Sequence, residues 1–338
     1  MESAYIQPFQ GITGLISLRR SCVVFVDCED RIVVVLGGVP PAARGDEWKH
    51  SMDSLTAAVQ ASGTASTFTS KEKMHTRGKF TARVAGIGYG GGREHPGNFR
   101  INGKANQAAM GELLGHPDMK RLVGWTNCLF NAYGHQTYVE YRETLQEHLA
   151  RYPNLQPTSS NTAFAATTIN HGPQTCTGRH RDAGNTAHGW CSDTALGNFD
   201  ADKGGHLVLW DLKLIIRFPA GATILFPSAL ITHSNLPIQT HETRYSIIQY
   251  SSGGLFRWRY NGWCSDKTFL AHATVEQLQK RERERAQRWS INLQKFTRWQ
   301  DLFDGDVKGE YVGDEGQDNG SNFQKSDIVE HRSKRQRH

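Results

Sequence analysis

The chain of 338 residues is long enough for one large domain or two small ones, and its hydrophobic fraction of 38% can bury a sizeable core. No apolar run approaches the ~18 residues of a membrane helix, and the N-terminal MESAYIQPFQ lacks the basic and apolar regions of a secretory signal. The 39 basic and 33 acidic residues give a net charge of +6, which favours a polyanionic partner such as nucleic acid. The six cysteines include no Cys-x-x-Cys pair, which argues against a zinc ribbon or a disulfide scaffold.

The N-terminal part of the chain predicts one hairpin, one strand and two helical stretches. Two β-branched runs on either side of a turn-like DCED segment favour the hairpin. Trp48, Met52, Leu55 and Val59 recur at helical spacing and share one face. The predicted elements are a hairpin over 22–36, a helix over 46–62, a strand over 79–87 and helical residues over 105–152.

Between about residues 160 and 263 the pattern changes to many short strands. Glycine, proline and serine turns separate each strand-length run from the next. Many short strands at regular spacing are typical of a sandwich or barrel, whereas a parallel sheet would place helices between its strands. The predicted strands are 163–169, 178–182, 206–210, 213–218, 222–226, 232–235 and 244–250.

A polar helix is predicted at about 274–300, after the strand-rich region. Thr274 followed by Gln277 matches a capping box at its start. Its basic and acidic side chains interleave, which is typical of a solvated face whose charges pair with one another. Residues 304–338 contain few apolar side chains and are predicted to be disordered. Their last part, HRSKRQRH, matches either a nuclear import signal or a solubilising tail.

The segment GRHRDAGN contains the sharpest local feature. Side chains at i and i+2 of a strand face the same side, so His180 and Asp182 are predicted to point together while Arg181 points away. An imidazole and a carboxylate supply two of the three ligands of a facial metal triad, which leaves positions open for substrate and oxygen. His116 and Asp118 have the same spacing, but the proline between them predicts a helix start at which the two side chains diverge.

Two later residues belong to the same pattern. His233 ends one predicted short strand, and Arg244 opens the next. In a sandwich these strands can lie beside His180, so that His233 completes the triad. Arg244 would then hold a carboxylate beside the metal, because a guanidinium makes two parallel hydrogen bonds that lysine cannot copy. Each residue alone is more often an ordinary strand-end histidine or a solvated arginine, but the residue types in this order indicate a metal site.

The sequence around these residues resembles the TET/JBP branch of the Fe(II)/2-oxoglutarate dioxygenases, and more narrowly the fungal TET-like proteins, in the stretches TTINHGPQTCTGRHRDAGN, GGHLVLWDLKLIIRFPAGATILFPSALITHSN and ETRYSIIQYSSGGLFRW. The resemblance covers about residues 80–265. It implies an α+β fold with a double-stranded β-helix core of the jelly-roll, cupin-like kind. It also implies that His180, Asp182 and His233 are the catalytic iron ligands and that Arg244 holds the distal carboxylate of 2-oxoglutarate.

Four further residues are candidates for contacts with the co-substrate or the substrate. Asn170 resembles the asparagine that related dioxygenases direct at the co-substrate. Asn185 either contacts substrate or closes the turn after the predicted strand. Arg93, in the glycine-rich segment, either touches a phosphate or belongs to a surface loop. Trp190 either stacks on a base or packs in the core.

Two other motifs do not predict a site. The glycines at 86, 88 and 91 match a dinucleotide fingerprint, but the GREHPGNFR that follows is hostile to the helix that this fingerprint needs. His188 and Cys191 have a spacing that zinc sites use, but no second Cys/His pair accompanies them. The glycines are therefore expected to form a flexible loop close to a ligand backbone or DNA. The segment of His188 and Cys191 is expected to be a loop with ordinary side chains.

The sequence thus predicts one catalytic domain and a charged tail. The expected parts are a domain over 1–303, with an N-terminal hairpin and helices over 20–152, a β-helix core over about 160–263 and a C-terminal helix over 274–300, and a disordered tail over 304–338.

The leading expected function is oxidation of the methyl group of 5-methylcytosine or N6-methyladenine in DNA, with Fe(II), 2-oxoglutarate and oxygen. The expected partner is duplex DNA whose methylated base is flipped out of the stack. No membrane and no obligate protein partner is expected, and the expected localisation is nuclear. The alternatives are a protein side-chain hydroxylase on the same fold and an inactive, transposon-derived DNA-binding protein.

Overall fold

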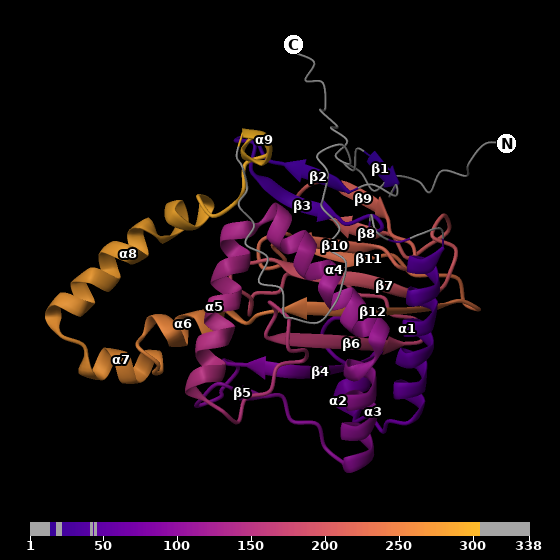
Figure 1. Ribbon diagram of the computed structural model, residues 1–338, viewed down its shortest axis with the longest axis horizontal. Coiled ribbons are helices and arrows are strands. Elements are labelled where there is room, and N and C mark those ends of the chain that lie inside the picture. Colours follow the sequence, from indigo (N-terminus) through magenta and orange to yellow (C-terminus); the bar gives the residue numbers. More distant parts are fainter. Residues whose placement is uncertain (1–13, 18–21, 41–42, 44–45, 305–338) are drawn as a thin grey trace, which may run out of the picture.

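The computed structural model describes residues 14–17, 22–40, 43 and 46–304, which form two β-sheets covered by helices on one side (Figure 1). The strands of the larger sheet are β2 (Val23–Val26), β3 (Ile32–Leu36), β4 (Thr81–Gly88), β5 (Gly97–Asn98), β6 (Ala166–Gly172), β7 (Cys191–Asn198), β10 (Thr223–Phe226) and β12 (Thr243–Tyr250). Those of the smaller sheet are β1 (Gly14–Ser17), β8 (Leu207–Leu209), β9 (Leu214–Arg217) and β11 (His233–Asn235).

The strand order is that of a double-stranded β-helix. The larger sheet runs β2-β3-β10-β7-β12-β6-β4-β5, and the smaller runs β1-β9-β8-β11. From β7 onwards the chain passes back and forth between the sheets, because β7, β10 and β12 belong to the larger and β8, β9 and β11 to the smaller. Neighbouring strands are antiparallel except for the parallel pair of β1 and β9. The jelly-roll core expected from the resemblance is therefore confirmed, as an open sandwich.

One part of the sandwich interior is a dry apolar core. Val34, Leu36 and Ile224 of the larger sheet pack in one cluster with Leu209 and Ile216 of the smaller, and none of these side chains is exposed. Burial of such side chains contributes about 1.5–3 kcal/mol each and holds the sheets face to face. The other part of the interior is lined by polar side chains and forms the site described below.

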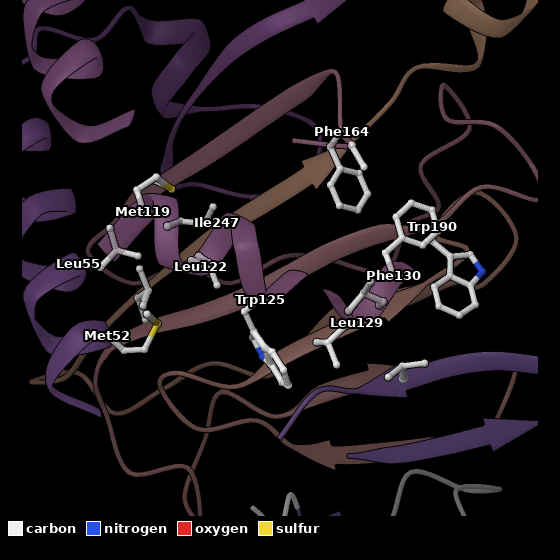
Figure 2. Close-up of a cluster of buried hydrophobic side chains, with 14 of the residues drawn as sticks. Met52, Leu55, Met119, Leu122, Trp125, Leu129, Phe130, Phe164, Trp190 and Ile247 are labelled. Atoms are coloured by element: carbon white, nitrogen blue, oxygen red, sulfur yellow. The ribbon is translucent and has the colours of Figure 1, made fainter. Parts of the chain in front are cut away.

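Helices cover the outer face of the larger sheet (Figure 1). The side chains of Ile169 and Ile247 point to that face and pack with Leu55, Phe130 and other helical residues in the largest apolar cluster. Figure 2 shows part of this cluster, with Phe130 and Trp190 side by side. The helices are α1 (Glu47–Thr64), α2 (Ser70–Lys73), α3 (Lys104–Gly115), α4 (Pro117–Tyr133) and α5 (His135–Arg151).

In the described part of the chain, the helices after β12 are α6 (Gly253–Tyr260), α7 (Asp266–His272), α8 (Val275–Leu293) and α9 (Asp301–Asp304). Helices α7 and α8 extend away from the sandwich, whereas α6 packs beside α5 and α9 lies next to β2 and β3 (Figure 1). The predicted capping box of Thr274 and Gln277 is present at the start of α8. The charges of α8 pair within the chain as expected, for example Lys280 with Glu284. Among the described residues, no helix has both the length and the apolar character of a membrane span.

Several boundaries differ from the prediction. The hairpin is confirmed by the antiparallel pairing of β2 with β3, but the helical stretch 105–152 is three helices, interrupted before Pro117 and at Gly134. Strand β7 was not predicted, because its sequence CSDTALGN has one β-branched residue, Thr194, and no aromatic side chain. Its central place in the sheet overrides that weak propensity. The predicted helix over 274–300 ends at Leu293, and α6 and α7 were not predicted. The tail beyond Asp304 lies outside the described residues.

Candidate active site

Two histidines and one aspartate converge at one end of the sandwich interior. The Nε2 atom of His180 lies 3.7 Å from Oδ1 of Asp182, and Nε2 of His233 lies 3.9 Å from Oδ2 of the same carboxylate. The possible ligand atoms of the three residues all lie within 4.8 Å of one another. Among the described residues, this is the cluster of histidine, cysteine and acidic side chains that could hold a metal ion.

Backbone pairing with β11 brings the triad together. The N–H of His180 donates to the carbonyl oxygen of His233 at 3.0 Å, and the N–H of His233 donates back at 2.9 Å. The N–H of Asp182 donates to the carbonyl oxygen of Ser228 at 2.9 Å. The predicted strand over 178–182 is therefore wrong as a regular strand, because it pairs with β11 only through the bridge at His180. That local pairing is enough to direct His180 and Asp182 to one side.

The chain also determines which ring nitrogen of each histidine is available. Nδ1 of His180 lies 2.8 Å from the carbonyl oxygen of Gly178, and Nδ1 of His233 lies 2.9 Å from that of Ile231. A carbonyl only accepts, so each Nδ1 carries the proton and each Nε2 keeps its lone pair for a metal. Burial lowers the pKa of His180, and it lowers the pKa of His233 to about 4. Both rings are therefore neutral at neutral pH, as metal ligands must be.

An arginine that the sequence analysis did not select contacts the triad carboxylate. Nη2 of Arg77 lies 2.5 Å from Oδ1 of Asp182. The carbonyl oxygen of Arg77 accepts a hydrogen bond from the N–H of Gly178 at 2.8 Å, so the loop before β4 is tied to the segment that carries His180. The Arg77 side chain is 47% exposed, whereas that of Asp182 is 12% exposed, so Arg77 lies at the rim of the site.

The inward face of the larger sheet forms the floor of a cavity beside the triad. Side chains at alternate positions face inward, and the strand register brings Asn170 of β6 opposite Ser246 of β12. The Nδ2 group of Asn170 donates to Oγ of Ser246 at 2.8 Å. The lining residues are Arg77, Thr168, Asn170, Thr177, His180, Asp182, Asn185, Cys191, Asp193, Leu207, Phe226, His233, Asn235, Arg244, Ser246, Ile248 and Tyr250.

Arg244 is the most deeply buried cation of this cavity. It is 1% exposed, and burial lowers the pKa of its guanidinium. Nη1 donates to the carbonyl oxygen of Thr175 at 3.3 Å, but Nε is buried and has no hydrogen-bond partner. Within the described residues, no carboxylate forms an ion pair with it. A buried guanidinium that lacks an anion and lines a cavity needs an anionic ligand to offset its desolvation.

The side chains of the cavity match the expected iron(II) and 2-oxoglutarate. Two neutral imidazoles and one carboxylate on a single side are the donor set of non-haem Fe(II) oxygenases. The unpartnered Arg244 lies in the same cavity and suits the distal carboxylate of a 2-oxo dicarboxylic acid. These residues fit iron(II) and 2-oxoglutarate.

Comparisons with known proteins add distant similarities. No family model matches the chain, and no curated protein matches it. Among solved structures, NgTET1 in complex with 5mC DNA is similar at 12% identity and a TM-score of 0.45, over 72% of this chain and 84% of that one. A 2OG-Fe(II) oxygenase family oxidoreductase from Burkholderia pseudomallei is similar at 17% identity and a TM-score of 0.35, over 65% and 86%. OsALKBH1 is similar at 12% identity and a TM-score of 0.32, over 64% and 96%.

The second His-x-Asp pair differs from its prediction in one respect. His116 and Asp118 do not diverge, since Nδ1 of the histidine lies 3.8 Å from the carboxylate. The reason is that His116 is the N-cap of α4, and its ring accepts a hydrogen bond from the backbone N–H of Asp118. No third ligand joins them among the described residues, so the pair is a helix cap, as the intervening Pro117 suggested.

The candidate substrate residues lie in different places. Asn185 lines the cavity, where its Nδ2 donates to Oγ of Ser228 at 3.1 Å, and its backbone N–H also closes a turn onto Asp182. Arg93 does not line the cavity, because its Nη1 donates to the carbonyl oxygen of Gly97 and its guanidinium stacks on a neighbouring ring. Trp190 is 2% exposed and stacks with Phe130 at 5.7 Å, so the hypothesis that it stacks on a base is wrong.

The His188 and Cys191 pair and the glycine-rich segment, from which no site was predicted, form no metal or dinucleotide site in the described part of the chain. His188 contacts Glu140 at 2.7 Å, and Lys295 binds the same carboxylate, which fixes the loop before β7 to α5. Cys191 lies in the cavity wall and takes no part in that cluster. The glycines from 90 to 92 have positive φ angles and form a loop without a following helix, so no dinucleotide site is present there.

The cavity residues that the sequence analysis did not select include Arg77, Asp193 and Ser246. Asp193 was missed because β7 itself was not recognised. A search for period-two polar positions would have found Ser246, which stands two residues after Arg244 on a predicted strand. No local signal selects Arg77, because only tertiary pairing with Gly178 brings it to the site.

Proposed function

We propose that this chain is an Fe(II)/2-oxoglutarate-dependent dioxygenase that oxidises the methyl group of a methylated base in DNA, either 5-methylcytosine or N6-methyladenine. The observation that carries the dioxygenase class is the common cavity of the His180, Asp182 and His233 triad and the unpartnered Arg244. Acid–base side chains alone cannot attack an unactivated methyl C–H bond, so the reaction needs such a cofactor.

Each residue has a defined role in this proposal. His180, Asp182 and His233 hold the metal on one side, which leaves its remaining positions for ligands. The bound iron supplies the oxidation of the methyl group at the expense of oxygen and 2-oxoglutarate, which becomes succinate and carbon dioxide. Arg244 binds the distal carboxylate, and Asn170, fixed by its hydrogen bond to Ser246, is proposed to contact the same co-substrate.

The walls of the cavity keep the reacting groups away from bulk water. Leu207, Phe226 and Ile248 line it beside the polar residues, and the Phe226 ring packs edge-on against His233 at 4.9 Å. An apolar wall strengthens the electrostatic attraction between Arg244 and a bound carboxylate and limits side reactions of the oxidant with water.

The DNA substrate is supported by the charge around the cavity. Arg77, Arg179 and Arg181 lie next to the triad, and the net charge of the chain is +6. Arg179 is exposed, with its guanidinium 4.8 Å from the ring centroid of Trp210, and Arg181 is 54% exposed. A base must leave the duplex to reach an interior site, and phosphate contacts would offset the cost of a few kcal/mol. Asn185, in the cavity wall, is proposed to contact that base.

A co-substrate turnover assay tests this proposal. Succinate release is measured with Fe(II), 2-oxoglutarate and a duplex that is unmethylated or that carries 5-methylcytosine or N6-methyladenine. The proposal predicts that one methylated duplex stimulates turnover over the unmethylated one. Equal turnover with all duplexes, together with stimulation by a peptide library, would instead support the protein side-chain hydroxylase.

A further inference from the structure

Asp193 places a second carboxyl group in the cavity, beside that of the triad. Its strand, β7, lies between β10 and β12, where Asp193 is opposite Ile224 and Ile248. The residue lines the cavity, and its Oδ1 atom is buried without a hydrogen-bond partner. A buried carboxyl oxygen without a partner is costly unless a ligand supplies one.

The strand register places Asp193 between the triad and Arg244. Phe226, which packs on His233, is opposite Cys191 at the triad end of β7. Arg244 is opposite Gly197 at the other end. Asp193 lies between Cys191 and Gly197 on the same inward-facing set of alternate positions. A dicarboxylate that reaches from the metal to Arg244 therefore crosses the part of the floor that Asp193 occupies.

Asp193 is not the permanent counter-ion of the buried arginine. Within the described residues it forms no ion pair, although it is attracted by Arg244 and repelled by Asp182. Burial is the main cause that raises the pKa of Asp193, to about 6. Its neutral form is therefore accessible close to physiological pH.

We propose that Asp193 is a co-substrate-positioning residue that binds 2-oxoglutarate as a neutral carboxylic acid and donates a hydrogen bond to it. The inference rests on the proposed function, since it takes 2-oxoglutarate as the ligand. The proton comes from solvent when the free protein has an ionised Asp193, so binding takes up one proton and breaks no covalent bond of the ligand.

The charges of the filled cavity favour the neutral form. A divalent metal and Arg244 balance Asp182 and the 2-oxoglutarate dianion, so an ionised Asp193 would add an uncompensated negative charge. Burial keeps the other titratable groups near the cavity uncharged at neutral pH, because it lowers the pKa of the histidines and raises that of the thiols and the phenol; these groups are His180, His233, Cys176, Cys191 and Tyr250. The Arg77 guanidinium lies at the rim, where its side chain is 47% exposed, so solvent screens its charge.

Calorimetric titration of 2-oxoglutarate tests the role of Asp193. Wild type and Asp193→Asn, both saturated with Mn(II), are compared from about pH 5.5 to about pH 8 in two buffers of different ionisation enthalpy. Above about pH 6, wild-type affinity should fall by up to tenfold per pH unit, with uptake approaching one proton. Asp193→Asn keeps a donor without the charge, so its affinity should stay level and its proton uptake should vanish. Ser192→Ala, whose side chain points to the other face of β7, should behave as wild type.

Two results would overturn the inference. Parallel pH profiles for wild type and Asp193→Asn would mean that Asp193 does not donate to the ligand. A loss of affinity in Asp193→Asn, with no proton uptake by wild type, would mean that the ionised form is the useful one. If wild type and Asp193→Asn both fail to bind 2-oxoglutarate at every pH while Mn(II) still binds, the proposed function itself fails.

Discussion

The chemistry of this site depends on a few polar residues inside an otherwise apolar sandwich. The triad was predictable because its residue types, their order and the period-two rule all agree, and the rule held even though residues 178–182 form only one bridge to β11. Arg244 was predictable from its place at the start of a strand. Arg77 and Asp193 were not, since one is brought in by a tertiary contact and the other lies on a strand with a single β-branched residue.

Replacing Asp182 by alanine removes the only anionic ligand of the proposed metal site. We expect metal binding and turnover to be lost while thermal stability changes little, because the carboxylate faces the cavity and not the apolar core. Calorimetric titration with Mn(II) measures the metal affinity. His116→Ala, at the helix cap, is the matched control and should bind metal normally. The triad assignment would be wrong if the control lost the metal and Asp182→Ala kept it.

Replacing Arg244 by lysine keeps the charge but loses the planar fork. We expect the affinity for 2-oxoglutarate to fall by about 1.5–3 kcal/mol, the value of a hydrogen bond to a charged group. Metal binding should be nearly unchanged, because the Arg244 guanidinium donates to the carbonyl oxygen of Thr175 and not to a triad residue. Half-saturation by 2-oxoglutarate in the turnover assay is the measurement. Equal values for both proteins would remove Arg244 from this role.

At the scale of secondary structure, the sequence predicted helix α1 and strands β8 to β12 but missed β7. Helix α1 follows from the spacing of its apolar residues, and the capping box predicted the start of α8. β7 could not be predicted from its own sequence, because pairing with its neighbours β10 and β12 stabilises it, whereas its own β propensity is weak. Gly197 on this strand has φ 120°, and a Cβ there would come within 2.2 Å of the Thr243 carbonyl oxygen. Position 197 therefore requires glycine.

His171 links β6 to α1 and makes the fold sensitive to acid. Its Nδ1 lies 3.3 Å from the carbonyl oxygen of Val59, its Nε2 has no partner, and burial lowers its pKa from 6.5 to about 4. The unfolded chain therefore takes up the proton first, and stability is full above about pH 6.5 and is lost as the pH falls towards 4. Between pH 7 and pH 5 we expect a loss of about 2 kcal/mol from this residue.

Urea unfolding of wild type and His171→Phe at both pH values measures this effect. Phenylalanine fills the same space beside Phe68 and cannot be protonated, so the variant should lose about 2 kcal/mol less on acidification. If both proteins lost the same free energy of unfolding, His171 would not be the source of the sensitivity.

At the scale of the whole molecule, the proposed catalytic groups all belong to the sandwich. The triad, Arg244 and the cavity walls come from its strands and the loops that join them, whereas α7 and α8 extend away from it (Figure 1). The sequence predicted this division, since its strand-rich region and its polar C-terminal helix have different residue patterns. It did not predict α6 and α7, whose short sequences have no sustained helical periodicity.

A chain that ends at Asp304 should still oxidise DNA in vitro, because the tail has few apolar side chains with which to form a site. Its DNA binding should weaken steeply with salt, since each neutralised phosphate releases counterions. Electrophoretic mobility shifts at several salt concentrations and the turnover assay check both points. A truncated chain that kept its metal and 2-oxoglutarate binding but lost oxidation would show that the tail holds the substrate. In cells, the same truncation should reduce nuclear accumulation if HRSKRQRH is the import signal.

The mass of the bases after reaction tests the central proposal most directly. The full chain is incubated with Fe(II), 2-oxoglutarate and a duplex that carries 5-methylcytosine or N6-methyladenine, and the nucleosides are then analysed by mass spectrometry. We predict a hydroxymethyl product from the first duplex, or unmodified adenine with released formaldehyde from the second, and neither product with Asp182→Ala. Unchanged nucleosides from both duplexes, in a preparation that binds metal and 2-oxoglutarate, would contradict the assignment of a methylated DNA base as the substrate.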